Sequence, residues 1–170
     1  MQPSNTFAAY TAVVLKHAER YLLLQRASTK RFAPNRWTGI GGGVLPSELG
    51  DLRAAALREL REETGIVESE VMRFALRRVL LHNRPNEPIT ALLYFTGILA
   101  EYKLPECSEG VLHWLTPEQI AGLDVIETTR AALPLLIQDT DHDPLGIEPV
   151  RLGIADYRGG TLTRVLWSGP

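Results

Sequence analysis

The chain has 170 residues, of which 45% are hydrophobic and 22% charged, and its formal net charge is −2. These values are typical of one globular domain with a sizeable core, and they exclude a largely disordered chain. With no basic run and a slight excess of acids, stable binding to duplex nucleic acid is not expected. No apolar run approaches the roughly 20 residues that span a bilayer, and the first residues do not resemble a signal peptide, so we expect a cytoplasmic protein without membrane contact.

Strands and helices are predicted in mixed order along the chain. The chain begins with a predicted strand over 8–15, a turn over 17–20, a strand over 21–25 and a polar loop to 34. A helix over 51–64 is followed by strands over 71–81 and 89–101, which flank a loop at 84–88. A strand over 111–115, a capping box at 116–119 and a helix over 127–138 complete this part. The helix over 51–64 has Asp51 as its N-cap and Gly65 at its C-terminal stop. This order predicts an α/β (α+β) sandwich with a mixed β-sheet between helices.

The C-terminal part of the chain follows a different pattern. Residues 138–149 are rich in Asp and Pro, which predicts a linker or covering loop. Residues 150–154 and 161–166 predict a β-hairpin. An isolated hairpin is marginally stable in water, so this one should pack on the sheet or on a second subunit. We therefore predict a main domain over 1–139, with a linker and C-terminal β-hairpin extension over 140–170.

Three acids form one stripe on the predicted helix, behind a glycine-rich turn. Residues three and four apart are neighbours on a helix, so Glu59, Glu62 and Glu63 should point the same way. The opposite side is expected to pack through Ala54, Leu57 and Leu60. The like charges of the three acids repel one another, and Arg58 can neutralise only part of that charge. A hard cation with oxygen ligands would offset the rest, and Mg²⁺ fits best.

The glycines before the helix favour an ion site over the simpler alternative, a solvated face rich in Glu and Arg. A helix alone has no use for the run Gly39-Ile40-Gly41-Gly42-Gly43. A backbone that turns tightly and approaches a metal or a diphosphate closely does need such a run. We therefore take Gly41 as a candidate for contact with the substrate.

The segment Arg58-Glu59-Leu60-Arg61-Glu62-Glu63-Thr64-Gly65-Ile66, with Gly42 and Glu48 upstream, resembles the signature of the Nudix hydrolase family. That signature runs Gly, five residues, Glu, seven residues, then Arg-Glu-hydrophobic-x-Glu-Glu-x-Gly-hydrophobic. Here nine residues separate Glu48 from Arg58, so two extra residues should loop out around 49–51. The strict register would place Gly50 at the first acid, and we take Glu48 as the equivalent.

The resemblance implies a Nudix hydrolase domain over 1–139, with an α/β/α fold that hydrolyses a diphosphate linkage. Glu59, Glu62 and Glu63 would be metal ligands or their immediate partners, and the carbonyl of Gly42 would be a further ligand. Arg58 would orient the acids. The cofactor would be Mg²⁺, with Mn²⁺ able to replace it. Such a metal lowers the pKa of a bound water, and a neighbouring carboxylate takes the proton.

Two further segments, 32–42 and 108–114, resemble Nudix members that hydrolyse oxidised purine nucleoside triphosphates. In those members an acid before the glycine of the second segment serves the metal and catalytic site. Glu109 is therefore an additional catalytic candidate, and Glu106 is its rival.

Most of the candidate substrate-binding side chains also have a purely structural interpretation. Trp37 and Trp114 could frame a purine by stacking, although a single Trp is more often a core aromatic. The cations before the glycine turn could meet phosphate oxygens, although a solvated loop charge is equally common. They are Lys30, Arg31 and Arg36. Asn83 and Arg84 precede a loop and are candidates for contact with a base or a phosphate.

Three functions are compatible with this sequence. The first is a magnesium-dependent nucleoside triphosphate diphosphatase that releases a nucleoside monophosphate and pyrophosphate, with 8-oxo-purine nucleotides such as 8-oxo-dGTP as favoured substrates. The second is a pyrophosphatase for ADP-ribose or another nucleoside diphosphate linked to a group X. The third is a noncatalytic nucleotide sensor with a Nudix fold, and the retention of all three helix acids argues against it. In each case the partner is a small-molecule nucleotide, and the protein is a monomer or a homodimer.

Overall fold

The computed structural model describes residues 6–84 and 87–169, so the first five residues and Pro85 and Asn86 of the predicted loop lie outside the described residues. The described strands are β1 (Phe7–His17), β2 (Arg20–Arg26), β3 (Trp37–Thr38), β4 (Val71–His82), β5 (Ile89–Leu99), β6 (Gly110–Leu115), β7 (Arg151–Arg158) and β8 (Thr161–Trp167). The helices are α1 (Leu52–Thr64), α2 (Pro117–Ala121) and α3 (Glu127–His142), with short 3₁₀ turns η1 (Pro46–Glu48) and η2 (Glu68–Glu70).

These strands form one mixed sheet in the order β3-β2-β1-β5-β4-β7-β8, and β6 pairs with β2 as well. The pairs β1–β5 and β4–β7 are parallel, whereas the other pairs of named strands are antiparallel. The first half of β1 also forms isolated bridges with the glycine turn, from Tyr10 to Gly43 and from Val13 to Ile40. The turn is therefore held against the sheet next to β1.

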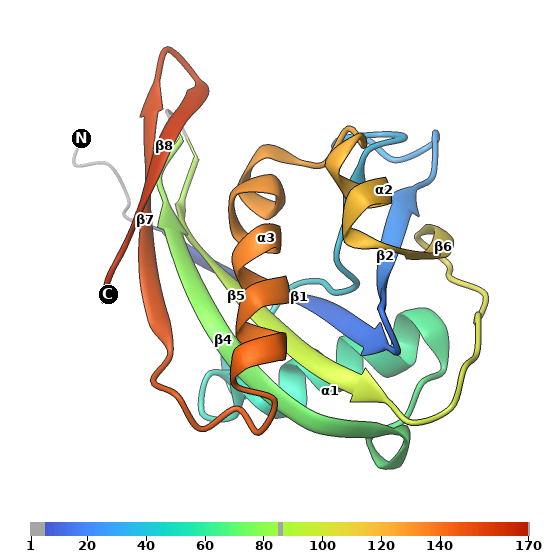
Figure 1. The fold of residues 1–170 in the computed structure, drawn as a ribbon. Coiled ribbons are helices and arrows are strands. Elements are labelled where there is room, and N and C mark those ends of the chain that lie inside the picture. The colour runs from blue at the N-terminus through green and yellow to red at the C-terminus, as the bar shows by residue number, and fades with distance from the viewer. Residues whose placement is uncertain (1–5, 85–86, 170) are drawn as a thin grey trace.

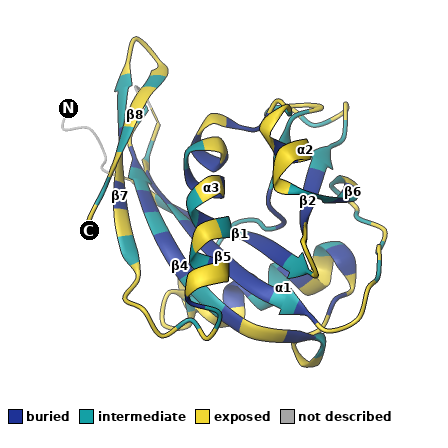
Figure 2. Cartoon of the chain, in the orientation of Figure 1, coloured by how far each residue is buried: buried dark blue, intermediate teal, exposed yellow. Residues whose placement is uncertain are grey.

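Helices cover both faces of the sheet, with α3 in front and α1 behind in the view of Figure 1. The core on the α1 side includes Leu60 and the stacked rings of Phe74 and Phe95, whose centroids are 5.2 Å apart. The core on the α3 side includes Leu80 and Leu133. Buried residues accordingly follow the strands and the inner sides of the helices (Figure 2). This arrangement confirms the predicted sandwich of helices around a mixed sheet.

Local capping chemistry fixes both ends of α1, as predicted. The Asp51 side chain accepts a hydrogen bond from the Ala54 N–H at 2.9 Å. Gly65 has a φ of 71°, and its N–H donates to the Arg61 carbonyl at 2.8 Å. At α2, the predicted capping box between Thr116 and Gln119 is also present, with Pro at the first turn.

The packing face of α1 differs from the prediction. Ala54 is exposed and Leu57 is only half-buried, whereas Leu60 is fully buried. The buried stripe is Ala55, Ala56, Leu60 and Thr64. Ala54 lies about 120° around the helix from Leu60, because each residue turns the helix by about 100°. It therefore could not share a face with Leu60.

Several boundaries also differ from the sequence-based ranges. Helix α3 continues to His142 instead of ending at 138, and Asp139 in its last turn is ion-paired to Arg78 of β4. The strand predicted over 150–154 instead runs from Arg151 to Arg158. The extension of α3 depends on a partner remote in sequence, which a local pattern does not reveal, whereas the added residues of β7 pair with β8 of the same hairpin.

The C-terminal hairpin continues the main sheet. Val79 of β4 pairs with Leu152 of β7, and Leu81 pairs with Ile154, in parallel register. Figure 1 shows β7 and β8 at the edge of the sheet beside α3. The hairpin therefore pairs with the sheet of its own chain. The division of the chain at residue 139 stays a prediction.

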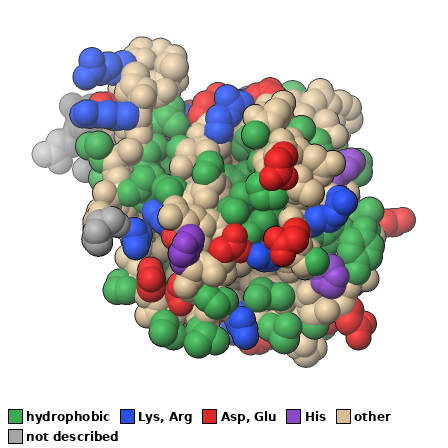
Figure 3. All heavy atoms as spheres, viewed as in Figure 1, with side chains coloured by type: hydrophobic (Ala, Val, Ile, Leu, Met, Phe, Trp, Pro, Cys, Tyr) green, Lys and Arg blue, Asp and Glu red, His purple; other side chains and the backbone are tan. Residues whose placement is uncertain are grey.

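On the face that carries α3, acidic and basic side chains are interspersed among hydrophobic ones (Figure 3). Ion pairs such as Arg36–Glu127 at the start of α3, at 3.0 Å, neutralise charge locally. Among the helices of residues 6–84 and 87–169, none is long and apolar enough to cross a membrane.

Candidate active site

Arg58 on α1 is hydrogen-bonded to three acids near the glycine turn. Its Nε donates to Glu48 Oε1 at 2.6 Å, and its Nη1 donates to Glu59 Oε1 at 2.8 Å and to Glu62 Oε2 at 2.9 Å. Its Nη2 donates to the Gly43 carbonyl at 3.0 Å, which ties the turn to the helix. The hydrogen bonds from Arg58 hold the pKa of Glu48 below its usual range. Arg58 thus fixes the orientation of these carboxylates.

Glu48 reaches Arg58 in spite of the two extra residues of the sequence. It ends the short turn η1, and its carboxylate also accepts a hydrogen bond from the Leu45 N–H at 2.9 Å. Residues 49–50 then form a turn, and α1 begins at Leu52. The extra residues therefore loop out between η1 and α1, as the register with Glu48 requires.

Glu59 and Glu63, one turn apart on α1, both reach the glycine turn. Glu63 Oε2 accepts a hydrogen bond from the Gly41 N–H at 3.3 Å. A Cβ placed on Gly42 would lie 2.5 Å from Glu59 Oε2, so the Glu59 carboxylate lies directly against this glycine. Gly41 has a φ of 147°, and a Cβ there would clash with the backbone of Thr11. Gly41 consequently requires glycine, whereas a side chain at Gly42 would displace the Glu59 carboxylate.

Glu63 is the most perturbed acid of this site. Its pKa is raised to about 7, first by burial and then by the nearby charge of Glu109, with a smaller contribution from Glu59. The Gly41 N–H and Lys30 act in the opposite direction. Lys30 Nζ lies 2.5 Å from Glu109 Oε2. Three carboxylates and one ammonium group, from three separate segments, thus converge beside the glycine turn.

Glu109 therefore lies at this site, whereas its rival Glu106 is exposed. The Ser108 N–H donates to the Glu63 carbonyl at 3.4 Å, which holds the segment of Glu109 against the end of α1. Glu62 differs from its neighbours because its side chain is 60% exposed and its carboxylate contacts Arg58 instead of the glycine turn.

The Gly42 carbonyl does not point at the acids. It accepts a hydrogen bond from the Thr11 N–H at 2.9 Å, because Gly42 pairs with β1 in the same way as Ile40. Its role as a metal ligand stays a prediction. Thr11 itself, a buried residue whose Oγ1 lies 3.4 Å from the Gly42 carbonyl, was missed by the sequence analysis. The available signal was a hydroxyl side chain inside an apolar strand.

The donor chemistry of the site fits a hard divalent cation. Glu59, Glu63 and Glu109 offer only carboxylate oxygens. Lys30 is paired with Glu109, and Arg58 is paired with Glu48, Glu59 and Glu62, so the acids of the site outnumber its two cations. Within the described ranges, no group of three or more His, Cys, Asp or Glu side chains is arranged tightly enough to hold a metal. Arg58 is one reason why the carboxylates lie apart, because its guanidinium hydrogen-bonds Glu59 and Glu62.

Comparison with known families shows where this site belongs. Residues 6–136 match the family model of the NUDIX domain. The chain belongs to the Nudix family. Its fold is similar to that of a MutT protein from Bacillus halodurans, with a TM-score of 0.62 and 20% identity over 94% of this chain and 97% of that one. It is also similar to the dihydroneopterin triphosphate pyrophosphohydrolase of E. coli, with a TM-score of 0.62 and 22% identity over 77% of this chain and 95% of that one.

A sequence relative supports the same family. Over 66 residues, the chain is 39% identical to the Caenorhabditis elegans protein named "Putative nudix hydrolase 7". This match covers 37% of the present chain and 22% of that protein, so the two are similar over about a fifth of the relative's length. The resemblance based on Arg58–Ile66 is confirmed, and the Nudix family is one of pyrophosphohydrolases.

The loop cations that precede the Nudix turn have different surroundings. Arg36 donates to Glu127 Oε1 at 3.0 Å, to the Val125 carbonyl at 2.9 Å and to Asp124 Oδ1 at 3.3 Å. It joins the loop to the start of α3, which leaves its expected contact with phosphate unsupported. Lys30, in contrast, lies beside the catalytic candidates.

The two remaining loop candidates are peripheral in the described structure. Arg31 is exposed, and so is Asn83, which follows the last residue of β4. Their predicted contacts with phosphate or base stay predictions.

The two tryptophans do not frame one base. Trp114 is 7% exposed within the core on the α1 side, and its Nε1 donates to the Lys103 carbonyl at 2.8 Å. Trp37 packs against the core on the α3 side and lies 5.0 Å from the ring of His113. Neighbouring residues of β6 point to opposite faces, so His113 and Trp114 cannot share a pocket. The prediction that Trp37 and Trp114 together frame a purine is therefore wrong, and Trp114 is a core aromatic.

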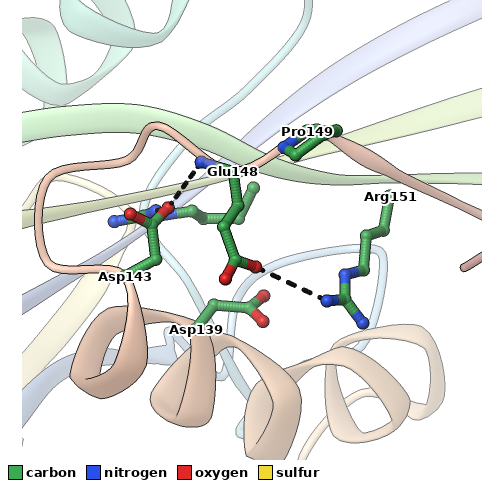
Figure 4. Close-up of a pocket in the computed structure, with 6 residues that line it drawn as sticks. Asp139, Asp143, Glu148, Pro149 and Arg151 are labelled. Carbon is green, nitrogen blue, oxygen red and sulfur yellow. Dashed lines mark hydrogen bonds and ion pairs between the residues drawn. The ribbon is translucent and has the colours of Figure 1, made fainter. Parts of the chain in front are cut away.

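A second charged cluster lies where α3 meets the C-terminal segment (Figure 4). Asp143 accepts from Arg77 Nη1 at 2.7 Å and from the Glu148 N–H at 3.0 Å, and Glu148 is paired to Arg151 at 3.5 Å. The cavity between these side chains measures about 10 Å³, which is about the space of one water. This Nudix chain therefore uses the cluster to hold its C-terminal segment.

Proposed function

We propose that the protein is a Mg²⁺-dependent hydrolase that cleaves a nucleoside triphosphate to a nucleoside monophosphate and pyrophosphate. The observation that carries this proposal is the convergence of Glu59, Glu63 and Glu109 with Lys30 at the glycine turn. The similar E. coli protein is named for action on a triphosphate, which supports a triphosphate here. Oxidised purine nucleotides, such as 8-oxo-dGTP, are the favoured substrates.

Each group of the site has a distinct part in this reaction. Glu59, Glu63 and Glu109 would hold Mg²⁺, which when bound lowers the pKa of a water and neutralises charge on phosphate oxygens. In the metal-free site the pKa of Glu63 is about 7, and a bound cation would favour its carboxylate form, which can accept a proton at its Oε atoms. Arg58 keeps the Glu59 carboxylate in place, and the backbone of Gly41 and Gly42 leaves room for close approach.

A second candidate function is the hydrolysis of a nucleoside diphosphate linked to a group X, such as ADP-ribose. One observation favours it. An open hollow of about 430 Å³ lies beside Glu109, lined by Gln25, Arg26, Ala27, Ser28, Asn35, Cys107, Ser108, Gly110 and Val111. This volume is within the range of small-molecule sites and offers room for a second organic group.

A substrate panel separates the two functions by their products. Purified protein with Mg²⁺ would be incubated with ordinary and oxidised purine nucleoside triphosphates, with ADP-ribose and with dinucleoside polyphosphates. We expect pyrophosphate and a nucleoside monophosphate from the triphosphates. Two organic phosphates from ADP-ribose, with intact triphosphates, would overturn the first function in favour of the second.

The raised pKa of Glu63 predicts that Mg²⁺ stabilises the protein more at high pH. The folded protein holds this proton more tightly than the unfolded chain, so the metal-free fold loses stability as the pH rises from about 4.5 to about 7. A bound cation favours the carboxylate and should remove this loss. We expect a larger rise in Tm with Mg²⁺ at about pH 8 than at about pH 5.5.

Thermal melts of wild type and Glu63→Gln at both pH values would check this expectation. The variant should lose most of the pH dependence of the Mg²⁺ effect. An equal Mg²⁺ effect at both pH values in the wild type would show that Glu63 does not contact the ion.

A further inference from the structure

Three buried polar atoms at one end of the sheet have no hydrogen-bond partner among residues 6–84 and 87–169. They are His82 Nδ1, Arg84 Nε and Tyr157 OH. The His82 side chain is itself deeply buried, with an exposed fraction of 8%. A buried polar atom without a partner costs about 1–3 kcal/mol, so native structures rarely leave several in one place. Such a group indicates a ligand that supplies the missing partners.

The three side chains lie together although they come from two strands and one loop. The rings of His82 and Tyr157 are 5.8 Å apart, and the Arg84 guanidinium lies 5.3 Å from the centre of the Tyr157 ring. Burial raises the pKa of the adjacent Tyr94, its hydrogen bonds with Thr128 and Thr129 act in the opposite direction, and the nearby Tyr157 raises it further. Strands β5, β4 and β7 are consecutive in the sheet, which explains why these residues meet.

This polar group is connected to the candidate active site through the loop before the glycine turn. Phe32 of that loop is 53% exposed, and its ring lies 5.9 Å from the Arg84 guanidinium. Farther along the same segment, Thr38 Oγ1 lies 3.4 Å from Thr129 Oγ1 at the start of α3. The Tyr94 hydroxyl is hydrogen-bonded to Thr129 in the same part of α3. Lys30, two residues before Phe32, is paired with Glu109, so this loop joins the polar group to the acids.

The chemistry of the group matches the edge of a nucleobase. Arg84 Nε and the Tyr157 hydroxyl are donors, and His82 Nδ1 either donates or accepts according to its tautomer. Burial and the charge of Arg84 lower the pKa of His82, which keeps its ring neutral. Guanine carries two adjacent acceptors, O6 and N7, on one edge. Aromatic rings beside these donors also provide faces on which a base can stack.

We propose that the C-terminal hairpin completes the nucleotide site of this protein, with Tyr157 and Arg84 donating to acceptors on a purine edge and His82 completing the contact. The hairpin lies outside residues 6–136, which match the NUDIX domain, so it adds a specificity element to the common fold. The inference rests on the proposed nucleotide hydrolysis, because the substrate's base is the ligand that it assigns.

Binding of GMP to the full-length protein, measured by isothermal titration calorimetry without any triphosphate, tests the inference. The variant Tyr157→Phe removes the hydroxyl and keeps the ring. We expect it to weaken GMP binding about fivefold, the loss associated with one hydrogen bond. Its unliganded Tm should equal or exceed that of the wild type, because the removed hydroxyl has no protein partner. Tyr102→Phe, at a site that is 61% exposed beside His17, is the matched control and should change neither value.

Three results would overturn the inference. They are equal GMP affinities of wild type and Tyr157→Phe, no measurable GMP binding by the wild type, and a lower Tm of unliganded Tyr157→Phe, which would show a structural partner of the hydroxyl. The failure of the proposed function looks different. A wild type that binds GMP through Tyr157 but releases no pyrophosphate from triphosphates would refute the hydrolysis and retain this site.

Discussion

Replacing Glu63 with Gln should lower kcat about a hundredfold, which corresponds to about 2.7 kcal/mol of transition-state stabilisation. Glu63 combines the features expected of a proton-transferring group in this site. It is largely buried, its pKa is raised to about 7, and its Oε2 is fixed by the Gly41 N–H at 3.3 Å. Glutamine keeps the shape of the side chain but cannot take a proton or bring a negative charge to a cation.

Steady-state hydrolysis of the best substrate from the panel would measure this effect. Glu68→Gln is a matched control, because Glu68 is an exposed acid paired with Arg53 and remote from the glycine turn. We expect its kcat to remain within about twofold of the wild type, as for most exposed surface changes. If Glu63→Gln retained full turnover with a normal melting curve, the acid would have no place in the mechanism.

The same substitution at Glu62 shows which acids work together. The sequence predicts a loss as large as that of Glu63→Gln, because all three acids share one stripe. In the unliganded structure Glu62 is exposed and bound to Arg58. A hundredfold loss in Glu62→Gln would therefore require Glu62 to leave Arg58 when substrate and cation bind. A loss below about tenfold would limit the working acids of α1 to Glu59 and Glu63.

Local chemistry made α1 and its acids predictable from the sequence. The cap at Asp51, the stop at Gly65 and the spacing of Glu59 and Glu63 all depend on residues within a few positions of each other. The packing face was also within reach of the sequence, because at about 100° per residue Ala56 lies about 40° from Leu60 and Ala54 about 120°, so helical geometry favours Ala56.

Contacts between remote segments explain the remaining differences. Trp37 and Trp114 were candidates for framing one base, with a core position as the alternative, and the registers of β3 and β6 on β2 put them on opposite faces. Arg36 was a candidate for phosphate contact, but the start of α3 supplies its partners. No local pattern around either residue contains this information. The pair Lys30–Glu109 has the same origin, since its members are joined only by the pairing of β2 with β6.

Arg78→Met should lower the free energy of unfolding by about 3–5 kcal/mol, the range found when one partner of a buried ion pair is removed. The Arg78 side chain is only 3% exposed. Its Nε and Nη2 donate to the two carboxylate oxygens of Asp139 at 2.6 and 2.7 Å. Its guanidinium also lies 5.0 Å from the centre of the Trp167 ring. One side chain of β4 thus joins the end of α3 to strand β8.

Urea denaturation of the wild type and a set of variants would measure this loss. Arg130→Met is the matched control, because Arg130 and its partner Asp124 have side chains that are 58% and 69% exposed. Exposed pairs contribute about 0–1 kcal/mol, so this control should unfold at nearly the wild-type urea concentration. A loss in Arg78→Met no larger than in Arg130→Met would show that the buried pair does not anchor α3 to the sheet.

The double variant Arg78→Met/Asp139→Leu distinguishes two quantities. One is the net contribution of the ion pair to the free energy of unfolding, and the other is the cost of leaving one charge buried without its partner. In the single variant, the Asp139 carboxylate, 16% exposed, loses its bidentate partner. Removing that carboxylate as well should restore much of the lost stability, because apolar replacement of a whole buried ion pair is often close to neutral. The contact with Trp167 is lost in both variants, so any loss that persists in the double variant measures how firmly Arg78 holds β8, and with it the hairpin that carries Tyr157.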